Sequence, residues 1–112
     1  REQEAVDALS NGLAHEGMAP LAGCTPQGLA RETVANAAKW SFVSKADALK
    51  SRPVLIVTSD DGLAPANDKF AAALREAGNG KVTTLHFATD HSYSDQRVAL
   101  SNAVMQWLAT IP

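Results

Sequence analysis

The sequence is poor in the features that define several large classes of protein. Its one cysteine, Cys24, excludes an intrachain disulfide. No apolar stretch approaches the roughly 18 residues of a membrane span. The formal net charge is -2 and the ten Lys and Arg residues are scattered, so the chain lacks the basic field that nucleic acid attracts. We therefore expect that the chain neither binds nucleic acid nor spans a membrane.

Length and composition are those of one soluble globular domain. The chain has 112 residues, of which 46% are apolar and 20% charged, which suits a single hydrophobic core. The first ten residues are charged and lack the apolar core of a signal peptide. The localisation therefore stays open.

Residues 1–50 show helical patterns and no convincing strand. Val6, Leu9 and Leu13 recur at the spacing of one helical face. Thr25 followed by Pro26 is typical of an N-cap and the first turn of a second helix. A third, short helix is expected within KWSFVSKADALK (39–50).

The second half of the chain predicts a strand, a helix and a second strand. VLIV (54–57) is a continuous β-rich run, as in a parallel strand that helices cover on both faces. Pro65 suits the start of a helix whose apolar face carries Phe70 and Leu74. The second strand is KVTTLHFA (81–88). A crossover of this length makes the two strands parallel.

A last helix is expected within residues 94–111, capped by Ser94 or Asp95. The predicted fold class is therefore α/β, but two parallel strands do not bury a sheet, and independent stability usually takes at least three. Either residues 1–50 hide further strands, or the chain assembles with another polypeptide, or it is the last piece of a larger sheet.

Polar groups follow both predicted strands. Asp60 and Asp61 come after the first strand, and Asp90 and His91 come after the second. In parallel α/β sheets functional groups gather beyond the carboxyl ends of the strands, so a carboxylate and an imidazole can meet there. A carboxylate that orients a histidine is the acid and base half of a catalytic triad.

Each of these residues also has a structural interpretation. Asp60 and Asp61 serve equally well as a cap for the helix that begins near Ala64. Asp90 is expected to form a turn, and a lone loop histidine such as His91 is commonly just solvated.

Metal and cofactor sites are not expected. The acids and His91 lack the ligand spacing of Cys/His or EF-hand sites, and the glycines do not form a phosphate loop. His86 lies inside the second strand and is expected to be structural.

Two stretches resemble consecutive segments of the α/β-hydrolase family, namely RPVLIVTSDDGLAP (52–65) and VTTLHFATDHSYSDQRVALSNAVMQWL (82–108). The first is similar to the penultimate core strand and acid turn, commonly Asp-x-x-Val-Pro, which implies that Asp61 is the catalytic acid. The second is similar to the last strand, histidine loop and closing helix, which implies that His91 is the catalytic base. The prolyl-oligopeptidase-like and dienelactone-hydrolase-like branches, which include esterases and peptidases, look closest.

The resemblance also implies a domain organisation. Residues 52–112 would be the last two parallel strands of a doubly wound α/β-hydrolase sheet with their flanking helices. Residues 1–51 would be a helical segment of the cap or lid type, which the family inserts before that strand.

One part of the family pattern is missing. The family's triad runs in the order Ser, Asp, His, with the serine in a Gly-x-Ser-x-Gly turn, and no such pentapeptide occurs here. The resemblance therefore implies that the serine and the oxyanion donors lie in an upstream part of the same protein or in a partner chain. The expected function is cleavage of an ester or amide bond in a small-molecule ester or a peptide, with residues 1–112 inactive alone.

Two other functions are compatible with the residues. A flavodoxin-like or receiver-like binding domain would use the acid pair to hold Mg²⁺ at the sheet edge, and a hydrolase relic would keep the scaffold for assembly with a partner chain. A hydrogen bond between Asp61 and His91 distinguishes the hydrolase hypothesis from these two alternatives, because it should raise the pKa of the histidine above the usual ~6.5.

Overall fold

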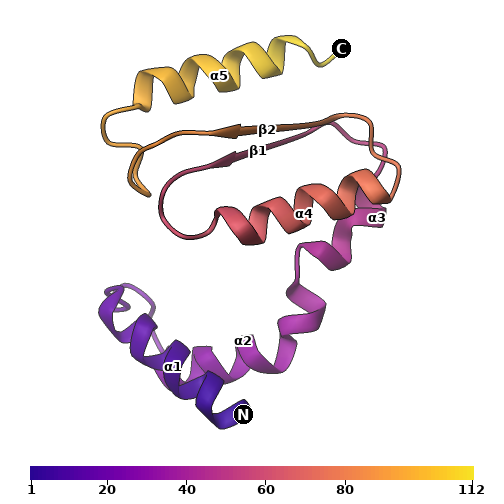
Figure 1. Ribbon diagram of the computed structural model, residues 1–112. Helices are drawn as coiled ribbons and strands as arrows, with labels where there is room; N and C mark the ends of the chain where they lie inside the picture. Colours follow the sequence, from indigo (N-terminus) through magenta and orange to yellow (C-terminus); the bar gives the residue numbers. More distant parts are fainter. The chain divides into compact units, whose positions relative to one another are not determined.

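The computed structural model describes residues 1–112 and divides into two compact units, Arg1–Ser41 and Phe42–Pro112. The division falls before the boundary at residues 51 and 52 that the sequence predicts, because the short helices after Ser41 pack against the helix that follows the first strand. Five α-helices, one 3-10 helix and two strands make up the chain (Figure 1).

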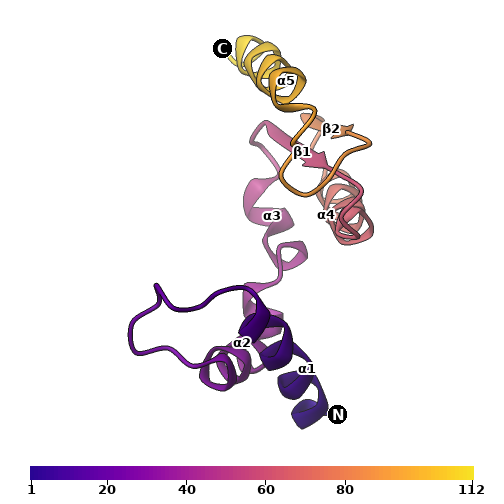
Figure 2. The same cartoon turned by 90° about the vertical axis from the view of Figure 1, so that its left-hand side faces the viewer.

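The first unit is a pair of helices, α1 (Glu2–His15) and α2 (Pro26–Trp40), which lie side by side (Figure 2). Val6 is buried on α1, and Ala30 is buried on α2. The predicted cap of α2 is confirmed, because the Thr25 hydroxyl oxygen accepts the Gly28 backbone N–H at 3.0 Å.

The second unit is built from η1 (Val43–Lys45), α3 (Ala46–Leu49), β1 (Val54–Thr58), α4 (Ala64–Glu76), β2 (Val82–His86) and α5 (Arg97–Ala109). The two strands pair in parallel, as predicted, in a register that sets Val54 opposite Val82 and Thr58 opposite His86. In Figure 1, α4 and α5 cover opposite faces of this sheet. The mixed α/β class is therefore confirmed.

The core of the second unit lies between β1, α3 and α4. Ala46, Ile56, Ala71 and Leu74 are buried there, and Leu74 is completely enclosed. Phe70 packs against this cluster, so the apolar face predicted for α4 is confirmed. Pro65 occupies the first turn of α4, as expected.

The helix predicted over residues 39–50 is wrong in detail. α2 continues to Trp40, and Ser41 then leaves the helical region with a ψ of 128°. The chain resumes only as the short elements η1 and α3. Phe42 is largely exposed and contacts Phe70, with ring centroids 5.9 Å apart.

The start predicted for the last helix is also wrong. α5 begins at Arg97, and no side chain caps it. Ser94 and Asp95 serve the preceding loop instead, since Asp90 accepts the Ser94 N–H at 3.0 Å and Asp95 accepts a hydrogen bond from Thr89. These hydrogen bonds within the loop compete with capping of the helix.

Residues 1–50 contain no strand, which removes hidden strands as the explanation for the small sheet. No helix of the chain is both long and apolar enough to span a membrane.

Candidate active site

The carboxyl ends of β1 and β2 lie next to each other, and backbone hydrogen bonds continue beyond the strands. The Phe87 N–H donates to the Thr58 carbonyl at 2.9 Å, and the Asp60 N–H donates to the Thr89 carbonyl at 3.0 Å. These bonds hold the turn after β1 against the loop after β2, so polar side chains of both can meet.

Asp61 and His91 meet across these two segments. Oδ2 of Asp61 lies 2.7 Å from Nδ1 of His91, the length of a charge-assisted hydrogen bond. Oδ1 of Asp61 accepts the Leu63 backbone N–H at 2.9 Å, which fixes the carboxylate from its other side. The structure thus brings the two predicted site residues together, and Asp61 makes both the triad-like contact and the turn contact.

The two partners differ in exposure. The Asp61 side chain is 14% exposed, whereas the His91 side chain is 76% exposed. Because a carboxylate only accepts hydrogen bonds, Nδ1 carries the proton in this contact, which makes Nε2 the basic nitrogen of the neutral ring. The acid is sheltered and the histidine presents a large surface to its surroundings.

The surroundings of Asp61 favour its charged form. The hydrogen bond from His91 and then the Leu63 N–H lower the pKa of Asp61 below the usual 3.8. The buried Ser59 hydroxyl adds a smaller lowering of the pKa of Asp61. Asp61 is therefore ionised at neutral pH.

Asp60 belongs to a second, separate set of contacts. Its Oδ1 lies 2.8 Å from Nε2 of His86, and Nδ1 of His86 lies 2.8 Å from the Thr58 hydroxyl. The adjacent acids Asp60 and Asp61 thus pair with different histidines.

The loop that carries His91 is held by its own turn. The Asp90 carbonyl accepts the Tyr93 N–H at 3.0 Å, while the Asp90 carboxylate accepts the Ser94 N–H. The Ser94 N–H lowers the pKa of Asp90. The Tyr93 ring contacts Phe87 edge to face, with centroids 5.9 Å apart. The predicted role of Asp90 as a turn former is confirmed.

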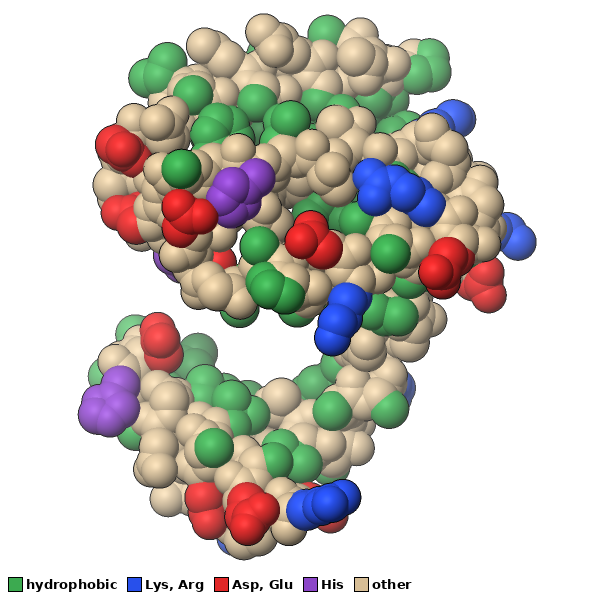
Figure 3. Space-filling model, in the orientation of Figure 1, with side chains coloured by type: hydrophobic (Ala, Val, Ile, Leu, Met, Phe, Trp, Pro, Cys, Tyr) green, Lys and Arg blue, Asp and Glu red, His purple; other side chains and the backbone are tan.

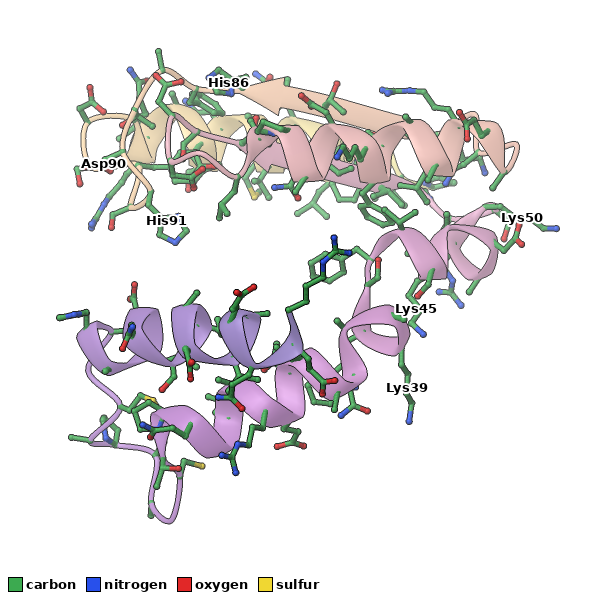
Figure 4. All side chains as sticks on the ribbon, turned by 60° about the horizontal axis from the view of Figure 1, so that its bottom comes forward. Lys39, Lys45, Lys50, His86, Asp90 and His91 are labelled. Atoms are coloured by element: carbon green, nitrogen blue, oxygen red, sulfur yellow. The ribbon has the colours of Figure 1, made fainter.

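His86, Asp90 and His91 lie at the same end of the sheet in Figure 4. Histidine and acidic side chains gather at this end of the second unit in the space-filling view (Figure 3). No group of three or more His, Cys, Asp and Glu residues could hold a metal ion.

The second unit also has a hollow away from the pair of Asp61 and His91. A cavity of about 360 Å³ lies between α5 and the amino ends of the strands, with Val82, Trp107 and Ile111 among its lining residues. Because Asp61 and His91 lie at the carboxyl ends, this cavity does not serve them.

Sequence reasoning missed the contact between Thr58, His86 and Asp60. Thr58 and His86 are each the last residue of a strand in the observed register, which the sequence alone does not fix. The contact therefore becomes visible only once the register is known.

No family model, curated protein or solved structure matches the chain.

Proposed function

We propose that this chain is the C-terminal part of an α/β-hydrolase-fold serine hydrolase and supplies the acid and the histidine of its triad. The observation that carries the proposal is the 2.7 Å contact between Asp61 and His91 at the carboxyl ends of neighbouring parallel strands. The nucleophilic serine and the oxyanion donors come from an upstream segment or a partner chain. The reaction is cleavage of an ester or amide bond.

Each residue has a defined part in this reaction. Asp61 holds the tautomer in which Nε2 of His91 is basic, and it stabilises the imidazolium that forms when Nε2 takes the serine proton. His91 then returns this proton to the leaving group and activates water in the second half of the reaction. The Leu63 N–H keeps Asp61 in place throughout.

The geometry argues against a receiver-like domain. Such a site would turn both acids of the pair toward one cation, whereas Asp60 contacts His86 and Asp61 contacts His91. Each acid is therefore bound by a different histidine. This arrangement favours a histidine-based reaction over Mg²⁺ binding at this sheet edge.

The small sheet supports the idea that further chain completes it. β1 pairs with β2 and with no other strand, so one edge of β1 keeps backbone groups that a neighbouring strand can bind. Residues 1–51, whose regular elements are all helices, are the candidate cap.

The test is hydrolysis of an activated acyl ester by the full-length protein and its variants. Asp61→Asn and His91→Gln are expected to lower kcat by about 10³- to 10⁴-fold. Glu76→Gln and His15→Gln are the matched controls for the acid and the histidine, since both residues are exposed. Activity that survives His91→Gln would refute the proposal.

A further inference from the structure

We propose that His86 is a positioning residue for the pair of Asp61 and His91, because it holds Asp60 away from His91. This inference rests on the proposed function, since it assigns a role within the same site. Two adjacent acids and two histidines allow two pairings, and only one of them aligns Asp61 with His91.

Asp60 has little else to direct it. Its side chain is 61% exposed, and its carboxylate contact is the 2.8 Å approach to Nε2 of His86. The backbone of Asp60 is fixed by its N–H bond to Thr89, so rotation of the side chain is the remaining freedom. Because Asp60 adjoins Asp61 in the chain, a carboxylate released at this position is free to compete with Asp61 for the Nδ1 proton of His91.

The ring of His86 is held firmly enough to direct Asp60. Nδ1 lies 2.8 Å from the hydroxyl of Thr58, which is only 8% exposed. The same hydroxyl lies 3.4 Å from the Leu85 carbonyl. A neutral ring accepts the Thr58 hydroxyl proton at Nδ1, whereas a charged ring donates there and the hydroxyl turns to Leu85. Both forms donate from Nε2 to Asp60.

The order of contacts, Thr58 to His86 to Asp60, also matches a nucleophile, base and acid. Thr58 does not suit that role, because its hydroxyl is buried between the strands beside the Leu85 carbonyl. An acyl group needs an approach to the attacking oxygen and donors for the oxyanion. The set is therefore a support for the site and not a second site.

The experiment compares His86→Phe with the double variant His86→Phe/Asp60→Ala in the full-length protein. Phe keeps a ring in the space of His86 but cannot bind Asp60, so Asp60 is released to compete for His91. We expect kcat/KM to fall by about 10- to 100-fold, mainly through kcat. Removal of the competing carboxylate in the double variant should restore most of the loss, and Asp60→Ala alone should remain near the wild-type rate.

A spectroscopic readout follows the pair without reference to catalysis. In ¹⁵N-histidine-labelled protein the Nδ1 proton of His91 should give a downfield resonance, assigned by its absence in His91→Gln. This resonance should shift or broaden in His86→Phe and return in the double variant. Thr58→Val removes the hydrogen bond to Nδ1 of His86, so it should shift the His91 resonance in the same direction as His86→Phe does, but by a smaller amount.

Two results would overturn the inference. One is an unchanged resonance and rate in His86→Phe. The other is a double variant as impaired as His86→Phe, which would make His86 only a structural residue. Failure of the proposed hydrolase function gives a different result, namely full activity in Asp61→Asn. The Nδ1 resonance of His91 reports the contact with Asp61 whether or not the protein is a hydrolase.

Discussion

Oδ2 of Asp61 lies 2.7 Å from Nδ1 of His91, although 30 positions separate the two residues in the chain. The parallel pairing of β1 and β2 makes this contact, because it places the ends of both strands at one edge of the sheet. The Leu63 N–H holds the other oxygen of the same carboxylate.

The first prediction concerns the proton on His91. Asp61→Asn keeps an oxygen acceptor but removes the negative charge that stabilises an imidazolium. The pH at which His91 titrates is therefore expected to fall in this variant, as measured by NMR of the imidazole ring. Asp68→Asn, on the exposed surface of α4, is the control and should change nothing. An equal effect of both variants would contradict the pairing.

The second prediction concerns stability in acid. The pKa of Asp61 is lowered in the folded protein, first by His91 and then by the Leu63 N–H. A lowered pKa means that the charged form stabilises the native state above the unfolded pKa, and that this contribution is lost as the pH falls through the folded value. Wild-type protein should therefore unfold at a higher temperature than Asp61→Asn near neutral pH.

This difference should shrink as the pH drops below the usual pKa of 3.8, because both proteins then carry a neutral side chain. Thermal unfolding followed from about pH 7 to about pH 2 measures the gap. A gap that stays constant over this range would show that Asp61 acts through packing and not through its charge.

The third prediction concerns Asn79, a buried residue between α4 and β2. Its amide donates to the carbonyls of Leu49 and Arg52, both at 2.9 Å, and its oxygen accepts the Lys81 N–H at 2.7 Å. Asn79→Ala leaves these groups unpaired and should lower the free energy of unfolding by about 2 to 4 kcal/mol. Chemical denaturation measures this loss.

The control for that variant is Asn102→Ala on the exposed surface of α5, which should change the free energy of unfolding by about 0.5 kcal/mol or less. Similar losses from both substitutions would show that the contacts of Asn79 contribute nothing specific.

The fourth prediction concerns Leu74, the largest completely buried side chain of the core. Leu74→Ala removes buried methyl groups and leaves a cavity, which should cost about 2 to 5 kcal/mol of unfolding free energy. Leu63→Ala removes the same atoms from an exposed position and should cost about 0.5 kcal/mol or less. Denaturant titration of both variants measures these losses of unfolding free energy. Equal losses would show that Leu74 is not a core residue.

Local patterns were sufficient for much of the fold. Thr25 and Pro26 predicted the start of α2, and the spacing of Phe70 and Leu74 predicted the inner face of α4. The two strands and their parallel pairing followed from an apolar run and the length of the crossover. These features depend on residues close together in the sequence, where spacing and capping chemistry act directly.

Two features, the start of α5 and the contact of His86 with Asp60, were not predictable in this way. Ser94 and Asp95 are good helix caps, but Asp90 and Thr89 bind them in the loop, and α5 starts later. At the site, the sequence placed Asp61 and His91 at one sheet edge, yet the link from His86 to Asp60 depends on the register of β1 against β2. Register is set by pairing between distant residues, which no local pattern contains.

The most direct test of the account is labelling of the full-length protein with a fluorophosphonate, followed by mass spectrometry to find the modified residue. The account predicts one labelled serine outside residues 1–112, with labelling lost in His91→Gln and retained in His15→Gln. An absence of labelling in the wild-type protein, or labelling that His91→Gln leaves unchanged, would contradict the claim that Asp61 and His91 belong to a serine hydrolase.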